Sequence, residues 1–408
     1  MSTPTNATNA SAAPAFPWIG LLTLAGAIFV SVTSEFLPTG LLPEMAAELD
    51  VSLSTAGLLV TVFAGTVVVA TTPLAALTRK YSRKGLVFVV LLVVALANVL
   101  AAIAPTYEIL VGARILGGLA HGLFWAVVAA YSAHLVPKHQ LGKAVAITSG
   151  GASAAFVLGV PVGTALGHAL GWRIAFAVIA AIVVLLALAV LRYLPPVDHH
   201  VPVRTGEIRL PMYKDRSMRG VVLLCIVIMI FLTGQNTYYT YIAPWLIEAA
   251  GFPDTSVAFL LFLFGGAGAI GLVLAGFASD RFPRRGFALA LIGVMASVLV
   301  LAVWSENSVV VVVAFVVWGV AFGGLPAMLQ TRMLHTASFR TRDFAAALQT
   351  TAFNIGIGGG ALLGGVLLDR SGIQSLPIAL VLFLAVGFVL LVGTDALRSA
   401  RARRGPSD

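Results

Sequence analysis

Three residues in the apolar parts of this sequence have the chemistry to hold or pass on a proton. Glu35 lies inside a long apolar run that starts near Trp18, and a carboxylate at membrane depth usually faces a cavity or a partner because its burial is costly. Arg114 and His121 lie in a later apolar run, seven residues apart, so they share one face of a helix. An imidazole changes its charge near neutral pH. These residue types favour a proton-coupling site, with a structural Glu35 and a hydrogen-bonded packing His121 as the alternatives.

A common depth makes Glu35 and Arg114 candidate partners. A buried arginine needs a partner, and Glu35 is the acid that the sequence places inside the membrane. Glu35 lies about 8 residues, or ~12 Å of helix, before Pro43 at the outer end of its run. Arg114 lies about 7 residues, or ~10 Å, after Tyr107 at the outer end of its own run. We therefore expect the two side chains to share a cavity, with a purely structural ion pair as the alternative.

The composition indicates a helical membrane protein. Of the 408 residues, 59% are hydrophobic and only 10% are charged, whereas a soluble protein carries about 25% charged residues. The apolar runs are continuous rather than alternating, which favours helices over a β-barrel. Each of twelve runs is long enough to cross a bilayer, which takes ~20 residues. They span 18–42, 55–77, 86–104, 107–131, 144–167, 173–194, 219–242, 255–279, 286–304, 308–331, 344–367 and 374–396.

The basic residues predict which side of the membrane each connection faces. Of the 25 Lys and Arg residues, all except Arg114, Arg173 and Arg370 fall in the connection that follows an even-numbered run or in the C-terminal tail. This bias places those segments and both termini in the cytoplasm. It also accounts for the net charge of +9 without a nucleic-acid partner.

A constant offset of 201 residues relates two halves of the chain. Thr39 meets Thr240 along it, and the glycines at 118, 122, 159, 163 and 171 meet those at 319, 323, 360, 364 and 372. Parallel six-helix repeats of this kind build one class of secondary transporter. We expect six-helix bundles at 18–194 and 219–396, a cytoplasmic linker at 195–218, a disordered tail at 1–17 and a basic tail at 397–408. The His199-His200 pair of the linker has no third ligand nearby, so no metal site is expected.

Polar residues at the repeat position of Glu35 are candidates for solute binding. Asn236 is the counterpart of Glu35, so the second half offers neutral hydrogen-bonding groups where the first has an acid. Such a site suits a neutral polar or amphipathic ligand at the midplane between repeats. An aromatic belt at the membrane interface is the alternative, and it fits Tyr241 and Trp245 best. The expected solute-binding residues are Glu35, His121, Trp125, Gln235, Asn236, Tyr239 and Asn354.

Two motifs resemble those of the major facilitator superfamily. The stretch GFASDRFPRR, from Gly276 to Arg285, resembles the family's loop motif G-x-L-A-D-R-x-G-R-K, whereas the first-half copy has Arg79 in place of the acid. The stretch from Arg114 to Gly122 resembles the family motif in which glycines follow a membrane-embedded arginine. Over residues 18 to 396 the chain is similar to the twelve-helix drug:proton antiporters, and above all to the bacterial branch of sugar, arabinose and purine-nucleoside effluxers.

The resemblance implies roles for further residues. In the family the loop motif latches the cytoplasmic side in the outward-open state, so here the latch should depend mainly on Asp280, a basic topology determinant being the alternative. The gating set is then Asp280, Arg281, Arg284, Arg285 and Arg83. The helix-packing set is Gly118, Gly122, Gly159, Pro161 and Gly163, and its second part is an interrupted form of the antiporters' glycine-proline motif.

The function that follows from residues and resemblance is proton-coupled efflux of a small organic solute such as a sugar, nucleoside or drug. We expect a monomeric, multi-pass protein of the bacterial inner membrane that works by alternating access and uses a proton gradient and no cofactor. An importer or a uniporter is the main alternative. An enzyme is not expected, because the runs contain no nucleophile–base or metal constellation. A receptor on the same scaffold would usually carry an added soluble domain.

Overall fold

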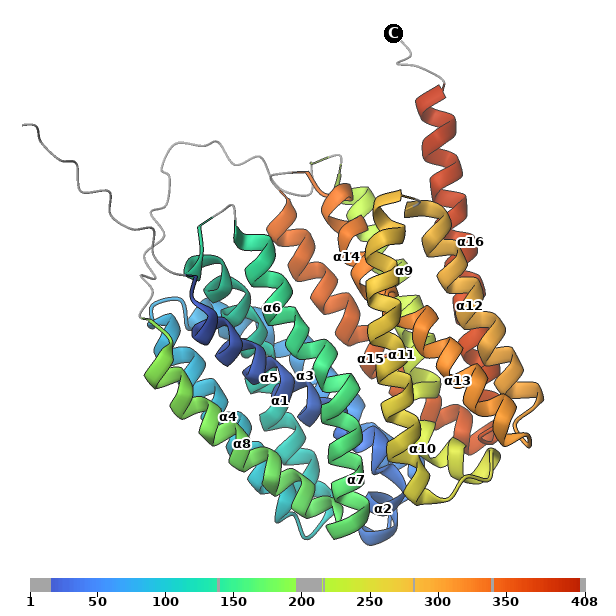
Figure 1. Cartoon of the computed structure of the whole chain (residues 1–408), viewed down its shortest axis with the longest axis horizontal. Helices are drawn as coiled ribbons and strands as arrows, with labels where there is room; N and C mark the ends of the chain where they lie inside the picture. Colours follow the sequence, from blue (N-terminus) through green and yellow to red (C-terminus); the bar gives the residue numbers. More distant parts are fainter. Residues whose placement is uncertain are drawn as a thin grey trace, which may run out of the picture.

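The computed structural model describes residues 16–137, 140–195, 215, 217–281, 283–338 and 341–403, and these ranges contain helices and no strand. Figure 1 shows the helices side by side in one bundle. In the first half they are α1 (Trp18–Gly40), α2 (Leu42–Glu48), α3 (Leu53–Leu77), α4 (Arg83–Ala102), α5 (Tyr107–Leu135), α6 (Leu141–Ala154), the π-helical turn η2 (Ala155–Gly159), α7 (Val160–Leu170) and α8 (Trp172–Tyr193). In the second half they are α9 (Met218–Tyr239), α10 (Ile242–Pro244), the π-helical turn η4 (Trp245–Ala249), α11 (Asp254–Arg281), α12 (Pro283–Val303), α13 (Ser308–Gly323), α14 (Leu325–Thr336), α15 (Arg342–Ser371) and α16 (Ser375–Arg403).

The outside of the bundle is apolar. Within the described ranges, eleven stretches are long and apolar enough to cross a membrane, and Ser375–Leu391 of α16 adds a shorter apolar segment. Large apolar side chains point outward along these helices; Val69, Leu185 and Phe277 are 76%, 65% and 74% exposed. Such a surface is unfavourable in water and suits lipid. The chain is therefore a helical multi-pass membrane protein, as its composition indicated.

The two halves repeat the same close helix contact. A Cβ on Gly118 of α5 would lie 2.7 Å from the carbonyl oxygen of Phe63 in α3. In the second half, a Cβ on Gly319 of α13 would lie 2.6 Å from the carbonyl oxygen of Phe264 in α11. Both the glycines and the phenylalanines are related by the offset of 201 residues. Since a side chain at either glycine would push the helices apart, the internal repeat of the sequence is also a repeat of packing.

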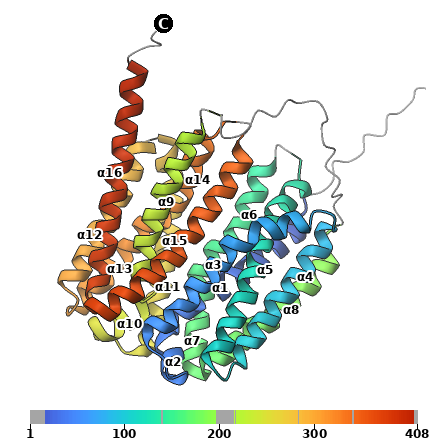
Figure 2. The same ribbon diagram turned by 180° about the vertical axis from the view of Figure 1, so that it is seen from behind.

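The halves meet along two seams. α3 packs against α15, and α7 and η2 pack against α11, while Figures 1 and 2 show α1 to α8 on one side of the bundle and α9 to α16 on the other. In the first seam the hydroxyl of Thr61 donates to the carbonyl oxygen of Gly358 at 3.0 Å. In the second, Gly265 lies against the carbonyl oxygen of Phe156. Thr61 and Gly265 lie near the middle of their helices. Closer to the helix ends opposite the C-terminus, Gly365 of α15 lies against Ser54 of α3, so the contacts between the halves extend from the middle of the bundle to that side.

The helix boundaries differ from the expected runs at two places where proline interrupts the backbone bonds. The first run ends at Gly40, and a short helix, α2, follows with Pro43 in its first turn. The tenth run is divided at Gly324, because α14 begins with Leu325 and Pro326. Proline has no N–H and is favoured where a helix starts. Most of the expected linker, 195–218, and the tail before Phe16 lie outside the described residues, and the basic tail begins as a continuation of α16.

Candidate functional site

Arg114 is bound to the backbone of α1. Its Nη1 donates to the carbonyl oxygen of Ser34 and its Nη2 to that of Glu35, both at 2.9 Å. In a regular helix the carbonyl of Ser34 accepts from the N–H four residues later, but that residue is Pro38, which has no N–H. Arg114 thus supplies the donor that the proline removes. Its guanidinium also lies 4.2 Å from the ring centroid of Phe63, close enough for a cation–π interaction.

The carboxylate of Glu35 contacts His121 instead of Arg114. Its Oε2 lies 3.4 Å from Nε2 of the imidazole, and the two residues are only 5% and 3% exposed. The structure therefore brings Glu35 and Arg114 together as their depth suggested, but through the backbone oxygen of Glu35. The acid is left beside a titratable ring rather than in an ion pair with a permanent cation, which is an arrangement suited to reversible proton binding.

His121 is held at both ring nitrogens. Nδ1 lies 2.9 Å from the hydroxyl oxygen of Ser31, and Nε2 accepts a hydrogen bond of 2.8 Å from the indole N–H of Trp125, one turn along α5. The ring of Phe63 packs against the imidazole with centroids 5.2 Å apart. A histidine with this many contacts has one fixed orientation, so the sequence-based interpretations of His121 as a packing residue and as a proton site are both compatible with its position.

Three members of this cluster escaped the sequence analysis. Ser31 bonds to His121, and the hydroxyl of Ser34 donates to Oδ1 of Asn98 in α4 at 2.8 Å. All three are buried. Ser31 lies four residues before Glu35 and so on the same helix face, and Asn98 is a lone amide in an apolar run. Both patterns are visible in the sequence and identify these residues in hindsight.

The second half carries a cluster of amide and aromatic groups. The indole N–H of Trp318 in α13 donates to Oε1 of Gln235 at 3.3 Å, and the rings of Tyr239 and Trp318 lie 6.2 Å apart. The other two candidates bond to their own helices: Asn236 donates to the carbonyl of Leu232 at 2.9 Å, and Asn354 donates to that of Thr350 at 3.0 Å. The structure thus brings two of the four predicted residues of this half together around Trp318, a residue that the sequence analysis did not select.

Among the four candidates of the second half, Asn354 has a buried side-chain oxygen, Oδ1, that accepts no hydrogen bond within the described part of the chain. A buried amide oxygen without a donor is costly. It is therefore available to a donor group on a bound molecule.

The alternative of an aromatic belt is wrong for Tyr241 and Trp245. Both side chains are fully buried. The hydroxyl of Tyr241 donates to the carbonyl oxygen of Ala361 at 2.9 Å, and a Cβ on Gly57 of α3 would meet that same hydroxyl. Tyr241 thus lies at the joint between the halves, and Trp245 packs on Tyr238 of its own half with ring centroids 5.3 Å apart, so neither ring lies at the lipid interface.

The predicted packing residues lie at close contacts. Gly122 lies against Thr71 of α3, Gly159 against Thr33 of α1, and Gly163 against Leu37 of α1. Pro161 lies in the first turn of α7, which follows η2 directly. The glycine-proline segment thus includes a π-helical turn that the sequence analysis did not anticipate, and π-turns are frequent at functional sites.

The expected gating residues lie near the connection between α11 and α12. α11 ends at Arg281 and α12 begins at Pro283. The side chains of Asp280 and Arg284 lie outside the described part of the structure, whereas Arg281 and Arg285 are exposed and Arg83 is half-buried at the start of α4. The latch therefore stays a prediction.

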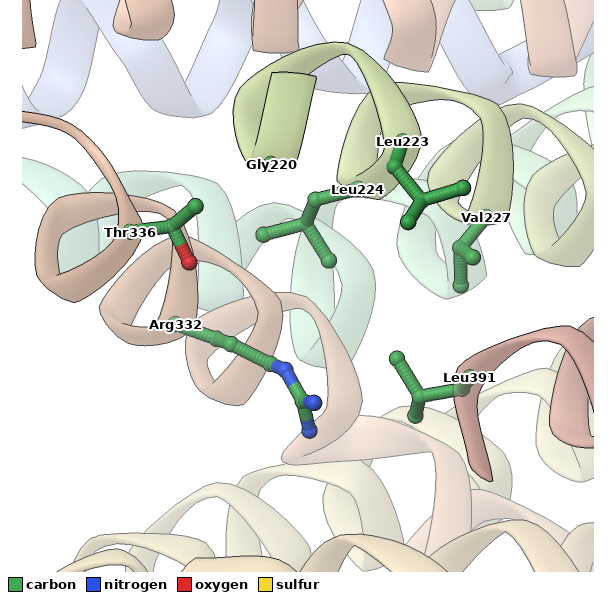
Figure 3. A pocket seen from close by; sticks show the side chains of 7 residues that line it. All are labelled: Gly220, Leu223, Leu224, Val227, Arg332, Thr336 and Leu391. Carbon is green, nitrogen blue, oxygen red and sulfur yellow. The ribbon is translucent and has the colours of Figure 1, made fainter. Parts of the chain in front are cut away.

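A small groove lies between α9, α14 and α16, away from these residues (Figure 3). Its walls are apolar apart from one guanidinium and one hydroxyl. They consist of Gly220, Leu223, Leu224, Val227, Arg332, Thr336 and Leu391. None of the predicted site residues lines it. Among the described residues no three His, Cys, Asp or Glu side chains are grouped so as to hold a metal ion, and the His199-His200 pair lies outside those residues.

Comparison with known proteins gives results at three levels. The family model for the Major Facilitator Superfamily matches residues 24–268 and 224–407. A probable sugar efflux transporter of Pasteurella multocida (strain Pm70) is 33% identical over 379 residues, which cover 91% of both chains. Another, of Helicobacter pylori (strain ATCC 700392 / 26695), is 31% identical and covers 85% of this chain and 87% of its own. In structure, a bacterial homologue of the human lysosomal transporter Spinster, in an inward-facing and unoccupied conformation, gives a TM-score of 0.76 at 15% identity over 93% of this chain and 97% of that chain.

Proposed function

The chain belongs to the Major Facilitator Superfamily, and on that basis we propose that it is a proton-coupled antiporter that exports a small organic solute. The observation that carries this proposal is the buried contact of 3.4 Å between Glu35 and His121. The names of the relatives support sugars as the first class of solute to examine. Export of a nucleoside or a drug remains part of the proposal, since one transporter scaffold serves many solutes.

Glu35 is the proposed carrier of the coupled proton. Burial favours its neutral acid, whereas the nearby charge of Arg114 favours the carboxylate. His121 offers a second position for the same proton at 3.4 Å. If a conformational change alters water access to this pair, the proton is bound on one side of the membrane and released on the other. Solute that binds better to the deprotonated form is then exchanged for protons.

The two seams described above are the contacts that alternating access would break and remake. We propose that residues 18–194 rock against residues 219–396, with α16 as the twelfth span and both termini in the cytoplasm. In that orientation the contact Gly365–Ser54 lies on the outer side of the pathway, and the contacts Thr61–Gly358 and Gly265–Phe156 continue the closure toward the middle of the membrane. Opening toward the outside then requires both seams to separate.

The amide and aromatic cluster of the second half is the proposed solute site. Gln235 offers an amide, Tyr239 a hydroxyl and Trp318 an aromatic face, and Asn354 adds its unpartnered oxygen. Hydroxyl-rich, ring-shaped solutes can hydrogen-bond to the amides and stack their apolar faces on the rings. The proposed functions of the halves differ accordingly: the first binds the proton and the second contributes most of the neutral contacts to the solute.

Transport by purified protein in liposomes tests the proposal. Vesicles are loaded with a labelled pentose, hexose, disaccharide, nucleoside or cationic drug, and a pH gradient is imposed in either direction. Antiport predicts uphill solute movement opposite to the proton gradient, together with proton flux that an internal pH dye detects only when solute is present. Movement in the same direction as protons would instead make the protein an importer, and movement indifferent to the gradient would make it a uniporter.

A further inference from the structure

Trp125 is hydrogen-bonded to the nitrogen of His121 that would exchange a proton with Glu35. Its indole N–H donates to Nε2 of His121 at 2.8 Å, and Oε2 of Glu35 lies 3.4 Å from that same nitrogen. An imidazole nitrogen has one in-plane position, which holds either a proton or a lone pair that accepts a hydrogen bond. Trp125 and Glu35 therefore cannot both bond to Nε2 at the same time.

The hydrogen bonds around the ring determine which form is present. An indole N–H can only donate, so Nε2 is the acceptor and the proton of the neutral ring is on Nδ1. From there it is donated to the hydroxyl oxygen of Ser31 at 2.9 Å. If Glu35 is ionised, its carboxylate and Nε2 of His121 are both acceptors, 3.4 Å apart, and no proton lies between them. If Glu35 is protonated, its O–H cannot donate to Nε2, because Nε2 already accepts from Trp125. In either state Glu35 stays unbonded to His121 for as long as the indole remains in place.

We propose that Trp125 is a positioning residue for the coupled proton: its indole must leave Nε2 before a proton can pass between Glu35 and His121. The inference rests on the proposed proton-coupling role of Glu35. In the step, the proton of the neutral Glu35 acid moves to Nε2 and leaves a carboxylate beside an imidazolium. The proton on Nδ1 stays on that nitrogen, in its hydrogen bond to Ser31, and the reverse step restores the neutral pair, so no other reactant is required.

The charges around the ring come from two helices. α1 provides Glu35, and α5 provides Arg114, whose permanent positive charge opposes formation of an imidazolium. The carboxylate produced in the same step favours the imidazolium. The remaining neighbours, the hydroxyl of Ser31 on α1 and the ring of Phe63 on α3, carry no charge. Removal of the indole is thus the change that makes the acceptor available without altering the charge of the site.

Trp125 is also the least buried member of the cluster. Ser31, Glu35 and His121 are buried, whereas Trp125 is half-buried. It lies about one helical turn beyond His121 along α5, toward the side of the termini. When the indole leaves, Nε2 becomes accessible from that side. The movement therefore links the protonation of the buried pair to one side of the membrane.

The variant Trp125→Phe tests the proposal, because it keeps an aromatic ring and removes the N–H. That hydrogen bond stabilises the form in which Nε2 carries no proton, so its loss should make protonation easier. We expect the pH midpoint of proton-driven efflux in liposomes, measured at saturating solute, to move up by about 0.5 to 1 unit. Trp172→Phe is the matched control: that indole is buried and its N–H has no hydrogen-bond partner in the described structure, so its midpoint should not move.

Tryptophan emission provides a second measurement that needs no transport. In purified protein, wild type should show a pH-dependent component of emission that both Trp125→Phe and Glu35→Gln lose and that Trp172→Phe keeps. If Trp125→Phe does not fold, the comparison of wild type with Glu35→Gln still decides the matter. An unchanged pH midpoint in Trp125→Phe, or an emission titration that survives in Glu35→Gln, would overturn the role of Trp125. Full gradient-driven efflux by Glu35→Gln would instead overturn the role of Glu35 as the proton carrier, whereas wild-type transport that ignores the pH gradient would overturn the proposed function itself.

Discussion

Arg114 and Ser34 are joined by a hydrogen bond of 2.9 Å from the guanidinium to the backbone carbonyl, and this bond replaces one that α1 cannot make. The carbonyl of Ser34 has lost its helical donor because Pro38 stands four residues later. A second bond of 2.9 Å to the carbonyl of Glu35 completes the arrangement. The positive charge of Arg114 thereby supports the interrupted helix at the residue that carries the acid.

The first prediction follows because the guanidinium of Arg114 takes the place of the backbone N–H that Pro38 lacks. Arg114→Ala leaves the carbonyl of Ser34 buried without a donor, which should destabilise the protein by ~1.5–3 kcal/mol. In the background Pro38→Ala, the restored N–H satisfies that carbonyl, so the cost of Arg114→Ala should fall by about 1 kcal/mol. Thermal unfolding in detergent, followed for the single and double variants, measures this coupling.

Pro73 provides the control for that cycle. Pro73 lies inside α3 and leaves the carbonyl of Val69 without its helical donor. In the described structure Arg114 makes no bond to that carbonyl. Pro73→Ala and Arg114→Ala should therefore have additive effects. Equal coupling in the two cycles would mean that the effect of Pro38 is a general one of proline on helix stability.

The second prediction concerns the acid. Glu35→Gln keeps the shape of the protonated side chain but cannot titrate, so it should reach the membrane and exchange solute without using a proton gradient. Asn236→Ala removes its counterpart in the second half and should alter solute affinity while leaving coupling intact. Counterflow and gradient-driven efflux, measured on the same liposomes, separate the two effects. Gradient-driven efflux at the wild-type rate in Glu35→Gln would direct attention to His121 as the proton carrier.

The third prediction concerns the second seam, in which α7 and η2 pack against α11. A Cβ on Gly265 would collide with the carbonyl oxygen of Phe156, whereas one on the neighbouring Gly266 would meet no atom within 4 Å. Gly265→Ala should therefore disfavour the closed seam by ~1–3 kcal/mol and reduce transport by about tenfold or more, and Gly266→Ala should transport normally. Accessibility of a cysteine placed beside the seam, measured by alkylation, should rise in Gly265→Ala alone. Similar transport and labelling of the two variants would show that the seam does not limit the cycle.

The fourth prediction concerns the latch implied by the loop motif. The second-half copy has Asp280 where the first-half copy has Arg79, so Asp280→Asn should impair transport more than Arg79→Ala does. Transport rates are compared at matched abundance in the membrane. An equal loss in both variants would remove the idea of a one-sided latch.

Sequence patterns were sufficient for the depth of the charged residues and for the repeat. Glu35 and Arg114 were expected at similar height because helix rise converts residue counts into distance, and the structure places the guanidinium on the carbonyl of Glu35. The glycine register of 201 residues predicted equivalent helix contacts, and Gly118 and Gly319 make them. Both inferences depend only on regular helix geometry, which the apolar runs impose.

The direction of individual side chains could not be predicted in the same way. Depth cannot distinguish a carboxylate from a backbone carbonyl as the partner of Arg114. The sequence analysis did not use the spacing between Ser34 and Pro38, which leaves a backbone oxygen without a donor. Burial of Tyr241 depends on a contact with the carbonyl of Ala361, 120 residues away, and no local pattern contains such information. The π-turn before Pro161 has a local signal, because the proline leaves the carbonyl of Val157 without its helical donor, but the contacts of the turn with α1 and α11 are long-range.

That π-turn makes the two halves mechanically unequal. Ala155–Gly159 is wound as a π-helix, whereas the residues 201 positions later lie in the uninterrupted α-helix α15. A π-turn is held by wider and less regular backbone bonds, so it bends more easily than a regular helix does. Gly159 at its end lies against Thr33, two residues before Glu35. The more compliant of the two equivalent helices thus stands next to the acid, and the stiffer one stands in the half that has no acid at the corresponding position.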